Sequence, residues 1–386
     1  MANTIVIQDT ITQVNTLIVE MPSDKLLQER YFPTGEMDIF DSKKVMVDFD
    51  NGNRMAGVFL KRGYDKQDTT TFFTQTVEPP RIGVVDSIDE VNNDKDRMMF
   101  ERLSRPQGDI RPTRADAMNG LLRLKAVRCA DRVSRSIERF CADVFRQNGI
   151  NISYKEAPGN NNTVTSQLFF YEGNTNPQAV SAHAKWGTNG ATPYKDVCAA
   201  LKELRAHGGR AEEVLMSPDA WDYLRADMIS LGLWNPAQIH MTLIANEKGR
   251  DNLFPEIMDY VEVIGDALFD GYRLKLLVYS GGCDVIPDDP DDPVEWESYL
   301  GERFVCITAP KCGRTLCGSV SKVNPRAIVD QEIDAVSCLT GKYIATRRVQ
   351  LDNDAGEDEG VQIRVESVPL PIPNRVWSWV TIDMGE

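Results

Sequence analysis

The longest helical pattern in the chain covers residues 113–148, and it restricts the possible folds more than any other feature. Its apolar residues fall largely at three- and four-residue steps, as on the buried face of a helix; they are Met118, Leu122, Val133, Ile137, Phe140, Cys141 and Val144. Thr113 can cap the start, and Asn148-Gly149 is a good stop signal. At about 1.5 Å per residue, this helix would be roughly 54 Å long. We therefore expect other elements to pack along it.

The same helix is rich in positive charge. It has four acids and eight bases, namely Arg114, Arg123, Lys125, Arg128, Arg132, Arg135, Arg139 and Arg146. Two interpretations stay open: a solvated helix face, or a helix that lies beside an acidic surface or faces nucleic acid.

The residues before the helix indicate an extended arm and then β structure. Residues 1–45 have little that can form a core of their own. A strand at 45–49, a turn at 50–53 and a strand at 55–60 precede a polar, basic tip at 61–71 and a further strand from Phe72. A hairpin of this kind is marginally stable alone, so we expect it to lie against something else, such as a neighbouring subunit.

After the helix the pattern is mixed. The predicted elements are strands within 150–185, helices at 192–206 and from Ser217, strands at 214–216, 273–280 and 304–308, a hairpin of 343–350 with 361–368, and a last strand at 378–382. This order predicts an α+β fold with a discontinuous domain, in which the late strands return to the long helix.

The net charge of −15 comes from two acidic segments. Residues 284–302 hold eight acids and residues 352–359 hold five, without a base in either, and both are predicted to be loops. The rest of the chain has 45 acids and 43 bases. This balance argues against broad non-specific binding to DNA, which needs clustered Lys and Arg.

Membrane and export signals are not evident. The sequence has no run of about 18 apolar residues that predicts a membrane-spanning helix. Its first residues lack the basic start and apolar stretch of a signal peptide, so we expect the protein to stay in the cell that makes it.

No catalytic chemistry stands out. Nucleotide-binding and nucleophile motifs are missing, and the three histidines form no metal-ligand pair. The eight cysteines fit small buried residues of a reducing compartment, and neither acidic segment has the Gly at position six of a calcium loop. We therefore expect no catalytic residue, no cofactor, no metal and no enzymatic activity. A carboxylate pair of a soluble hydrolase stays open as an alternative, because 58 acids offer many pairs.

Several short motifs follow one another along the chain in an order that resembles a known family. They are Tyr31-Phe32-Pro33, Met55-Ala56-Gly57-Val58, Lys185-Trp186, Ser217-Pro218-Asp219-Ala220-Trp221, Leu277-Val278-Tyr279-Ser280-Gly281 and Glu366-Ser367-Val368-Pro369-Leu370-Pro371. With the long helix, they resemble the phage major capsid protein E family, the major capsid proteins of lambda-type tailed phages. The resemblance runs from about Leu26 to the C-terminus.

The resemblance implies the Hong Kong 97 capsid fold. Its parts are an N-terminal arm (1–45), an E-loop hairpin (46–85), a peripheral domain (86–184 and 340–386) with the spine helix at 113–148, and an inserted axial domain (185–339).

The implied function is that of a major capsid protein, a structural protein of the virion that is assembled in the host cytoplasm. It would self-assemble as hexamers and pentamers into the icosahedral head shell around phage double-stranded DNA, without sequence-specific binding and without a membrane. The implied partners are other copies of the chain, a decoration protein, a scaffold and the portal. An encapsulin-like cargo shell is an alternative with the same fold.

The expected inter-subunit contacts join the basic E-loop to the second acidic segment of a neighbour. The candidate residues are Arg54, Lys61, Arg62, Lys66, Phe72, Phe73, Asp352, Asp354 and Asp358. Some relatives link subunits through an isopeptide, for which Lys61 or Lys66 with Asn353 or Asn374 is the alternative pairing here.

Overall fold

The computed structural model describes most of the predicted helices and strands. The described residues are 26–35, 38–40, 44–50, 72–88, 98, 101–103, 114–147, 149–155, 163–169, 179–233, 261–285, 295–318, 342–353, 356–375 and 377–385. The strand predicted at 55–60 and the polar tip at 61–71 lie outside these ranges.

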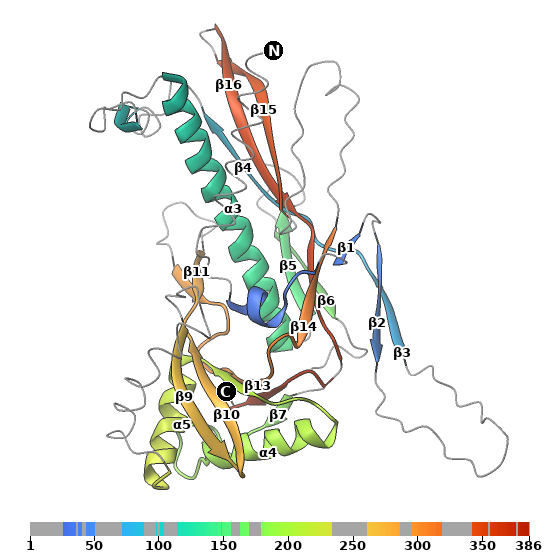
Figure 1. Ribbon diagram of the computed structural model, residues 1–386, viewed down its shortest axis with the longest axis vertical. Coiled ribbons are helices and arrows are strands. Elements are labelled where there is room, and N and C mark those ends of the chain that lie inside the picture. The colour runs from blue at the N-terminus through green and yellow to red at the C-terminus, as the bar shows by residue number, and fades with distance from the viewer. Residues whose placement is uncertain are drawn as a thin grey trace, which may run out of the picture.

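The predicted long helix is confirmed as α3 (Arg114–Gln147). Its apolar positions Val133, Ile137, Cys141 and Val144 are buried, as the spacing predicts. One side of α3 packs along strands from both halves of the chain, including β4 (Ile82–Ile88) near the start and β16 (Gly356–Ser367) near the end. Figure 1 shows α3 as a long diagonal rod with β4 and β16 along its upper part.

The predicted late hairpin is confirmed, and it is longer than expected. β15 (Lys342–Asn353) and β16 (Gly356–Ser367) pair antiparallel without a register shift, and β4 pairs with the other edge of β16. The prediction of a loop over 352–359 was wrong, because Asp352 pairs with Glu357 and Asn353 with Gly356 in the ladder. Backbone hydrogen bonds hold this ladder together and need no particular side chain.

A six-stranded sheet fills the lower part of the molecule in Figure 1, with α4 (Pro193–Ala206) and α5 (Pro218–Ser230) beside it. The strand order is β7-β18-β13-β8-β10-β9. The bounds are β7 (Ala179–Ser181), β8 (Glu213–Met216), β9 (Val261–Phe269), β10 (Tyr272–Tyr279), β13 (Val305–Thr308) and β18 (Val380–Asp383). The last strand of the chain thus joins a sheet whose other strands come from 179–308.

The remaining strands form small sheets. β1 (Ile39–Phe40), β14 (Gly313–Gly318) and β17 (Pro369–Pro373) make one of three strands. The two-stranded ribbons are β2 (Val45–Asp50) with β3 (Phe72–Val77), β5 (Gly149–Lys155) with β6 (Thr163–Phe169), and β11 (Gly282–Val285) with β12 (Glu295–Ser298). The strand at 45–49 therefore pairs with the strand from Phe72.

Two hydrophobic clusters form the core. The larger one surrounds α3 and takes in β14, β16 and β17, and the smaller one lies between α4, α5 and the six-stranded sheet. Trp186 in the smaller cluster is fully buried, and its indole Nε1 donates to a carboxylate oxygen of Asp196 at 2.8 Å. Burial of this large ring is favourable because its one polar atom has a partner.

The cysteines agree with the expectation of small buried residues. Cys129, Cys141, Cys198, Cys306, Cys312 and Cys317 are buried and unbonded to one another, and Cys283 is half-buried. Cys338 lies outside the described residues. No group of three metal-ligating side chains is placed to hold an ion among the described residues.

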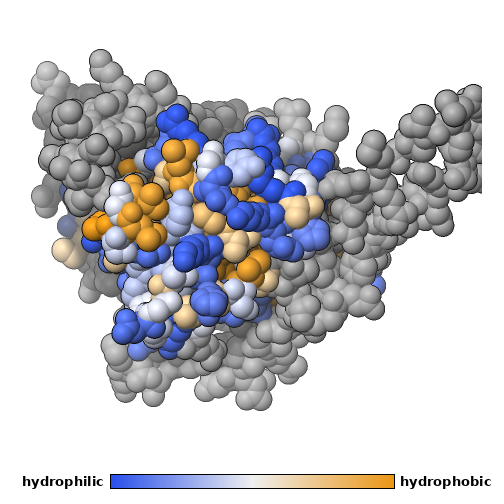
Figure 2. Space-filling view, turned by 90° about the horizontal axis from the view of Figure 1, so that it is seen from below, coloured by the Kyte–Doolittle hydropathy of each residue, from blue (hydrophilic) through white to orange (hydrophobic). Residues whose placement is uncertain are grey.

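The surface of the described residues is mostly polar. Figure 2, seen from below, shows hydrophobic residues in several small groups separated by hydrophilic ones. Such scattered apolar groups are ordinary on a protein surface. None of the described helices is long and apolar enough to cross a membrane.

Candidate functional site: the anchor of the N-terminal segment

The first described segment is a single helical turn inserted into the core of the molecule. This turn, η1 (Leu27–Tyr31), is a π-helix, closed by a hydrogen bond of 3.0 Å from the amide of Phe32 to the carbonyl of Leu27. Leu26, Leu27, Tyr31 and Phe32 are at most 1% exposed. The expectation of an extended arm was wrong for these residues, because two apolar pairs five residues apart, one turn of a π-helix, form one buried helical face.

A buried carboxylate of α3 caps the start of this turn. The two oxygens of Glu138 accept hydrogen bonds from the amides of Leu27 (2.7 Å) and Gln28 (3.0 Å). The hydroxyl of Tyr279, on β10, also donates to Glu138 at 3.0 Å. The first amides of a helix have no partner within the helix and attract negative charge. Glu138 therefore ties η1, α3 and β10 together through one side chain.

Burial makes Glu138 a weaker acid than an exposed glutamate. Desolvation raises the pKa of this fully buried carboxyl to about 7, although the hydrogen bonds from Leu27, Gln28 and Tyr279 act in the opposite direction. Its charge state therefore changes near neutral pH.

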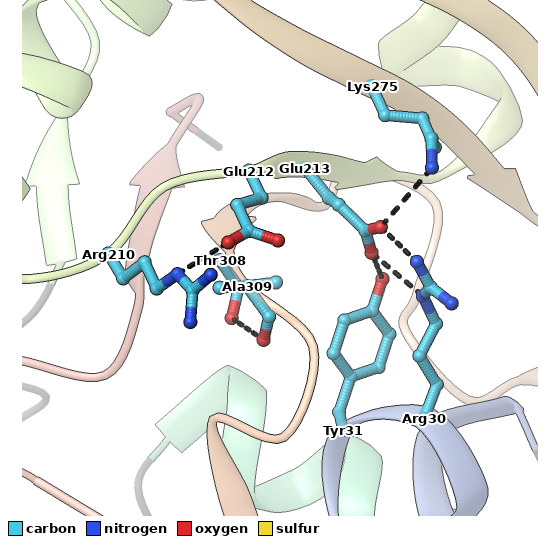
Figure 3. Close-up of polar contacts among 8 residues, drawn as sticks. All are labelled: Arg30, Tyr31, Arg210, Glu212, Glu213, Lys275, Thr308 and Ala309. Atoms are coloured by element: carbon cyan, nitrogen blue, oxygen red, sulfur yellow. Dashed lines mark hydrogen bonds and ion pairs between the residues drawn. The ribbon is translucent and has the colours of Figure 1, made fainter.

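A second buried carboxylate binds the other end of the turn (Figure 3). Glu213, at the start of β8, accepts hydrogen bonds from Arg30 Nε at 2.9 Å and from the Tyr31 hydroxyl at 3.0 Å. A second nitrogen of the Arg30 guanidinium contacts the other oxygen of Glu213, so the pair is bidentate. Lys275 Nζ lies 4.0 Å from the same carboxylate. Two cations and a hydroxyl thus surround Glu213, which is 2% exposed.

The pKa values reflect this pairing. Burial lowers the pKa of Arg30, but the hydrogen bond and the charge of Glu213 outweigh burial and raise it overall. Burial first, and then the charge of Glu213, raise the pKa of Tyr31 well above its ordinary value. Arg30 is therefore charged and Tyr31 neutral at all physiological pH values.

The carbonyl groups of the N-terminal segment accept hydrogen bonds from residues in and just before β14. The amide of Lys311 donates to Arg30 O at 2.9 Å, and Thr315 donates from its amide to Pro33 O at 3.2 Å. The Thr315 hydroxyl donates to Phe32 O at 2.7 Å. These bonds satisfy backbone groups that would be costly to bury alone.

Aromatic rings complete the anchor. Phe145 of α3 packs edge-to-face with Tyr31, Phe32 and Trp379, at centroid distances of 5.4, 5.0 and 5.0 Å. The ring of Phe32 lies directly against the backbone at Gly313, since a Cβ there would overlap the ring. We call residues Leu26–Pro33 with Glu138, Phe145, Glu213, Tyr279, Gly313 and Thr315 the arm anchor. The contacts of the arm anchor hold the N-terminal segment against α3, β10 and β14.

The structure describes only some of the predicted contact residues. Arg54, Lys61, Arg62, Lys66 and Asp354 lie outside the described residues. Phe72 and Phe73 are in β3, opposite Asp50 and Phe49 of β2. Asp352 and Asp358 are at the end of the β15–β16 hairpin.

Within one chain the described ribbons that carry these residues lie apart. Figure 1 shows the β2–β3 ribbon on the right and the end of the β15–β16 hairpin at the top. The two ribbons also belong to separate sheets.

Sequence reasoning missed the anchor residues Arg30, Tyr31, Glu138, Glu213 and Tyr279. One signal was available for Glu138, which falls between Ile137 and Cys141 on the apolar face of the long helix. An acid at a core position indicates a buried, hydrogen-bonded carboxylate. No local signal marks Glu213, because its partners lie 183 residues away.

The family follows from the comparison with known proteins. The family model of the phage major capsid protein E matches residues 8–230, which is more than half of the chain and includes η1, α3, α4 and α5. The chain belongs to this family. Its role is that of a subunit of a phage capsid shell.

One solved structure with a TM-score above 0.5 agrees at the level of the fold. A protein of E. coli CFT073, described as a candidate prophage capsid protein, is 13% identical with a TM-score of 0.59, and the alignment covers 98% of this chain and 99% of that one. A phage-related protein of Bordetella bronchiseptica RB50 is 11% identical with a TM-score of 0.48, over 97% and 96% of the two chains. The SrpI encapsulin of Synechococcus elongatus PCC 7942 is 8% identical with a TM-score of 0.38, over 94% and 88%. None of the curated proteins matches the sequence.

Proposed function

We propose that this capsid protein assembles as hexamers and pentamers into an icosahedral head shell around double-stranded phage DNA, and that it is not an enzyme. The β2–β3 ribbon is the observation that carries the proposal beyond the family match. It pairs with no other strand that the structure describes, and a two-stranded ribbon is marginally stable alone. A neighbouring subunit would supply the missing support.

The proposed division of the chain into domains follows the Hong Kong 97 capsid fold. The arm (1–45) and the E-loop (46–85) reach to neighbours, α3 is the spine of the peripheral domain (86–184 and 340–386), and residues 185–339 form the axial domain. The six-stranded sheet with α4 and α5 supports an axial unit, to which β7 and β18 contribute strands at its border.

The proposed inter-subunit contact joins the E-loop of one copy to the β15–β16 hairpin of another. Arg54, Lys61, Arg62 and Lys66 supply positive charge near Phe72 and Phe73, and Asp352, Asp354 and Asp358 supply negative charge. Asp352 is directly opposite Glu357 in the ladder, and like charges in such a pair are unfavourable. Cations of a neighbour would relieve this repulsion.

The remaining partners follow from the family resemblance. We propose a scaffold, a portal and a decoration protein as partners, and assembly in the host cytoplasm into the virion. A decoration protein takes the place of isopeptide links in this proposal, so the shell subunits stay unlinked by covalent bonds.

Electron microscopy of the purified full-length protein tests the proposal. We expect closed shells built from hexamers and pentamers, and DNA-filled heads when the phage packaging machinery is present. A discrete small oligomer with hydrolase activity would contradict it, and so would shells that enclose an enzyme in place of DNA.

The contact itself is tested with the double variant Lys61→Ala/Arg62→Ala. Each exposed ion pair contributes about 0–1 kcal/mol, but its repetition around the shell should lower particle yield and thermal stability. The matched control is Lys202→Ala/Arg210→Ala, whose cations are 68% and 81% exposed and pair with Asp270 and Glu212 within the chain. Equal yields for the two variants would contradict the proposed contact.

A further inference from the structure

The solvent-exposed side of α3 carries a row of five arginines, which we call the arginine face. Its members are Arg128, Arg132, Arg135, Arg139 and Arg146. At about 100° per residue they fall within a sector of roughly 60°. From Arg128 to Arg139 the row is about 16 Å long, at about 1.5 Å per residue. The opposite side of α3 packs on β4, β5, β16 and β17.

The end of the row near Arg146 lies beside acidic sequence. Arg139 pairs with Glu297 of β12 at 3.1 Å. Arg146 lies close to Gly301, since a Cβ there would be 3.8 Å from the guanidinium carbon. Of the two interpretations left open by the sequence, the helix face beside acidic sequence describes this end, where the segment 295–301 is the neighbour.

The other end of the row is different. Arg128, Arg132 and Arg135 make no ion pair with any residue that the structure describes. Asp131 is the one acid among the exposed or half-buried described side chains of α3. Among the described side chains of α3, these three cations in line thus have one half-buried carboxylate beside them.

The described side chains of α3 around these three arginines lack the features of a protein-binding surface. Protein interfaces have a desolvated centre with aromatic or aliphatic anchors. Leu124, 40% exposed, is the one exposed large apolar residue among the described side chains of α3. A regular row of guanidinium groups without apolar anchors fits a polyanion instead, because guanidinium groups bind phosphates in a bidentate manner.

We propose that Arg128, Arg132 and Arg135 bind the phosphate backbone of double-stranded DNA, without reading its sequence. The inference rests on the proposed enclosure of DNA, and it assigns this side of α3 to the inner surface of the shell. The chain as a whole has a net charge of −15 and repels DNA. The short row of arginines would give the packaged duplex one defined place of contact on a shell whose net negative charge otherwise repels it.

The test uses unassembled full-length subunits and a fluorescent 20-base-pair duplex of random sequence. Three phosphate contacts predict a slope of about −2.7 in the plot of log affinity against log salt, and hence a roughly 40-fold loss of affinity between about 50 and 200 mM salt. The variant Arg128→Gln/Arg132→Gln/Arg135→Gln should abolish most of this binding and flatten the slope.

Two further variants keep the test specific. Arg210→Gln/Arg225→Gln/Arg273→Gln removes the same charge from exposed sites outside α3, and it should retain the wild-type slope. Asp131→Asn removes the acid within the row and should tighten binding by several-fold. Thermal melting of each variant verifies that it is folded.

Several outcomes would overturn the inference. They are the absence of wild-type binding at low salt, equal losses in the two triple variants, and binding that depends on duplex sequence. A triple variant that binds DNA normally but fails to assemble would show that the row contacts an acidic protein surface. Shell formation is scored separately by electron microscopy, so intact shells with unaltered DNA binding would refute the arginine face alone and leave the proposed function standing.

Discussion

Glu138 of α3 and Tyr279 of β10 meet through a hydrogen bond of 3.0 Å, although 141 residues separate them in the sequence. The same carboxylate caps η1, so one polar side chain connects α3, the six-stranded sheet and the N-terminal segment. A change in the protonation of this side chain therefore affects the contacts of all three elements.

Stability should fall as pH rises through the range in which Glu138 ionises. The folded pKa is about 7 and the ordinary value is 4.5, so the folded state binds the proton more tightly than the unfolded state. The contribution is fully present below about pH 4.5 and is lost as pH rises through about 7, with a total of about 3 kcal/mol. Thermal melting of unassembled subunits from pH 5 to 8 measures it.

Glu138→Gln should flatten this part of the pH dependence, whatever its effect at a single pH. The matched control is Glu203→Gln, at a half-exposed position on α4, which should keep the wild-type profile. A profile unaltered by Glu138→Gln would contradict the prediction.

Loss of the second carboxylate should destabilise the protein much more than loss of its neighbour in the sequence. Glu213→Ala leaves Arg30, which is 16% exposed, without its anion, and such changes cost roughly 3–5 kcal/mol. Glu212→Ala removes only a pair with Arg210, which is 81% exposed, and should cost less than about 1 kcal/mol. Urea unfolding measures both, and similar midpoints would be evidence against a buried anchor.

Gly313→Ala should loosen the N-terminal segment. The added methyl group would overlap the ring of Phe32 and lie 2.6 Å from the carbonyl oxygen of Ile372, and overpacking of this kind costs about 1–3 kcal/mol. Limited proteolysis should then cleave around η1 faster than in the wild type. Gly120→Ala is the control, since its Cβ would meet Leu103 at 3.4 Å and Ala favours a helix; it should be neutral or stabilising.

Thiol labelling should report on the anchor. Burial raises the pKa of Cys141 and Cys306, and raises that of Cys312 to about 12, so these thiols are neutral and shielded. In the intact protein at pH 8, Cys283 should react first among the described cysteines, because it alone is half-buried. In Gly313→Ala, Cys312 should become reactive, as located by mass spectrometry of the labelled peptides. Early labelling of Cys312 in the wild type would be inconsistent with the anchor.

The sequence predicted the elements whose signals are local. The 3.6-residue period placed α3 within one residue at each end, and the Pro, Gly and Ser signals around α4 and α5 placed both helices. The predicted start of the last strand at Ser378 was wrong by two residues, because a turn closed by Ser378 and Arg375 precedes β18 (Val380–Asp383).

The anchor had no such local signal. A π-turn of five residues is too short to show a period, and its stability comes from Glu138, Glu213 and Thr315, which are 111 to 283 residues away along the chain. Pattern reasoning treats residues 26–33 as an isolated arm, whereas tertiary contacts make them part of the core. Long-range polar pairing of this kind is set by the fold, so only the structure identifies it.

The distances along the chain also set an order of events during synthesis. Phe32 leaves the ribosome 283 residues before Thr315, its last hydrogen-bond partner. At about 5–20 residues per second, this interval is roughly 15–60 s. The N-terminal segment can therefore meet Glu138 and Glu213 earlier, but it gains its hydrogen bonds to Thr315 only after that residue has been made. Translation products that stop before Thr315 lack these bonds, so the anchor is completed late in synthesis.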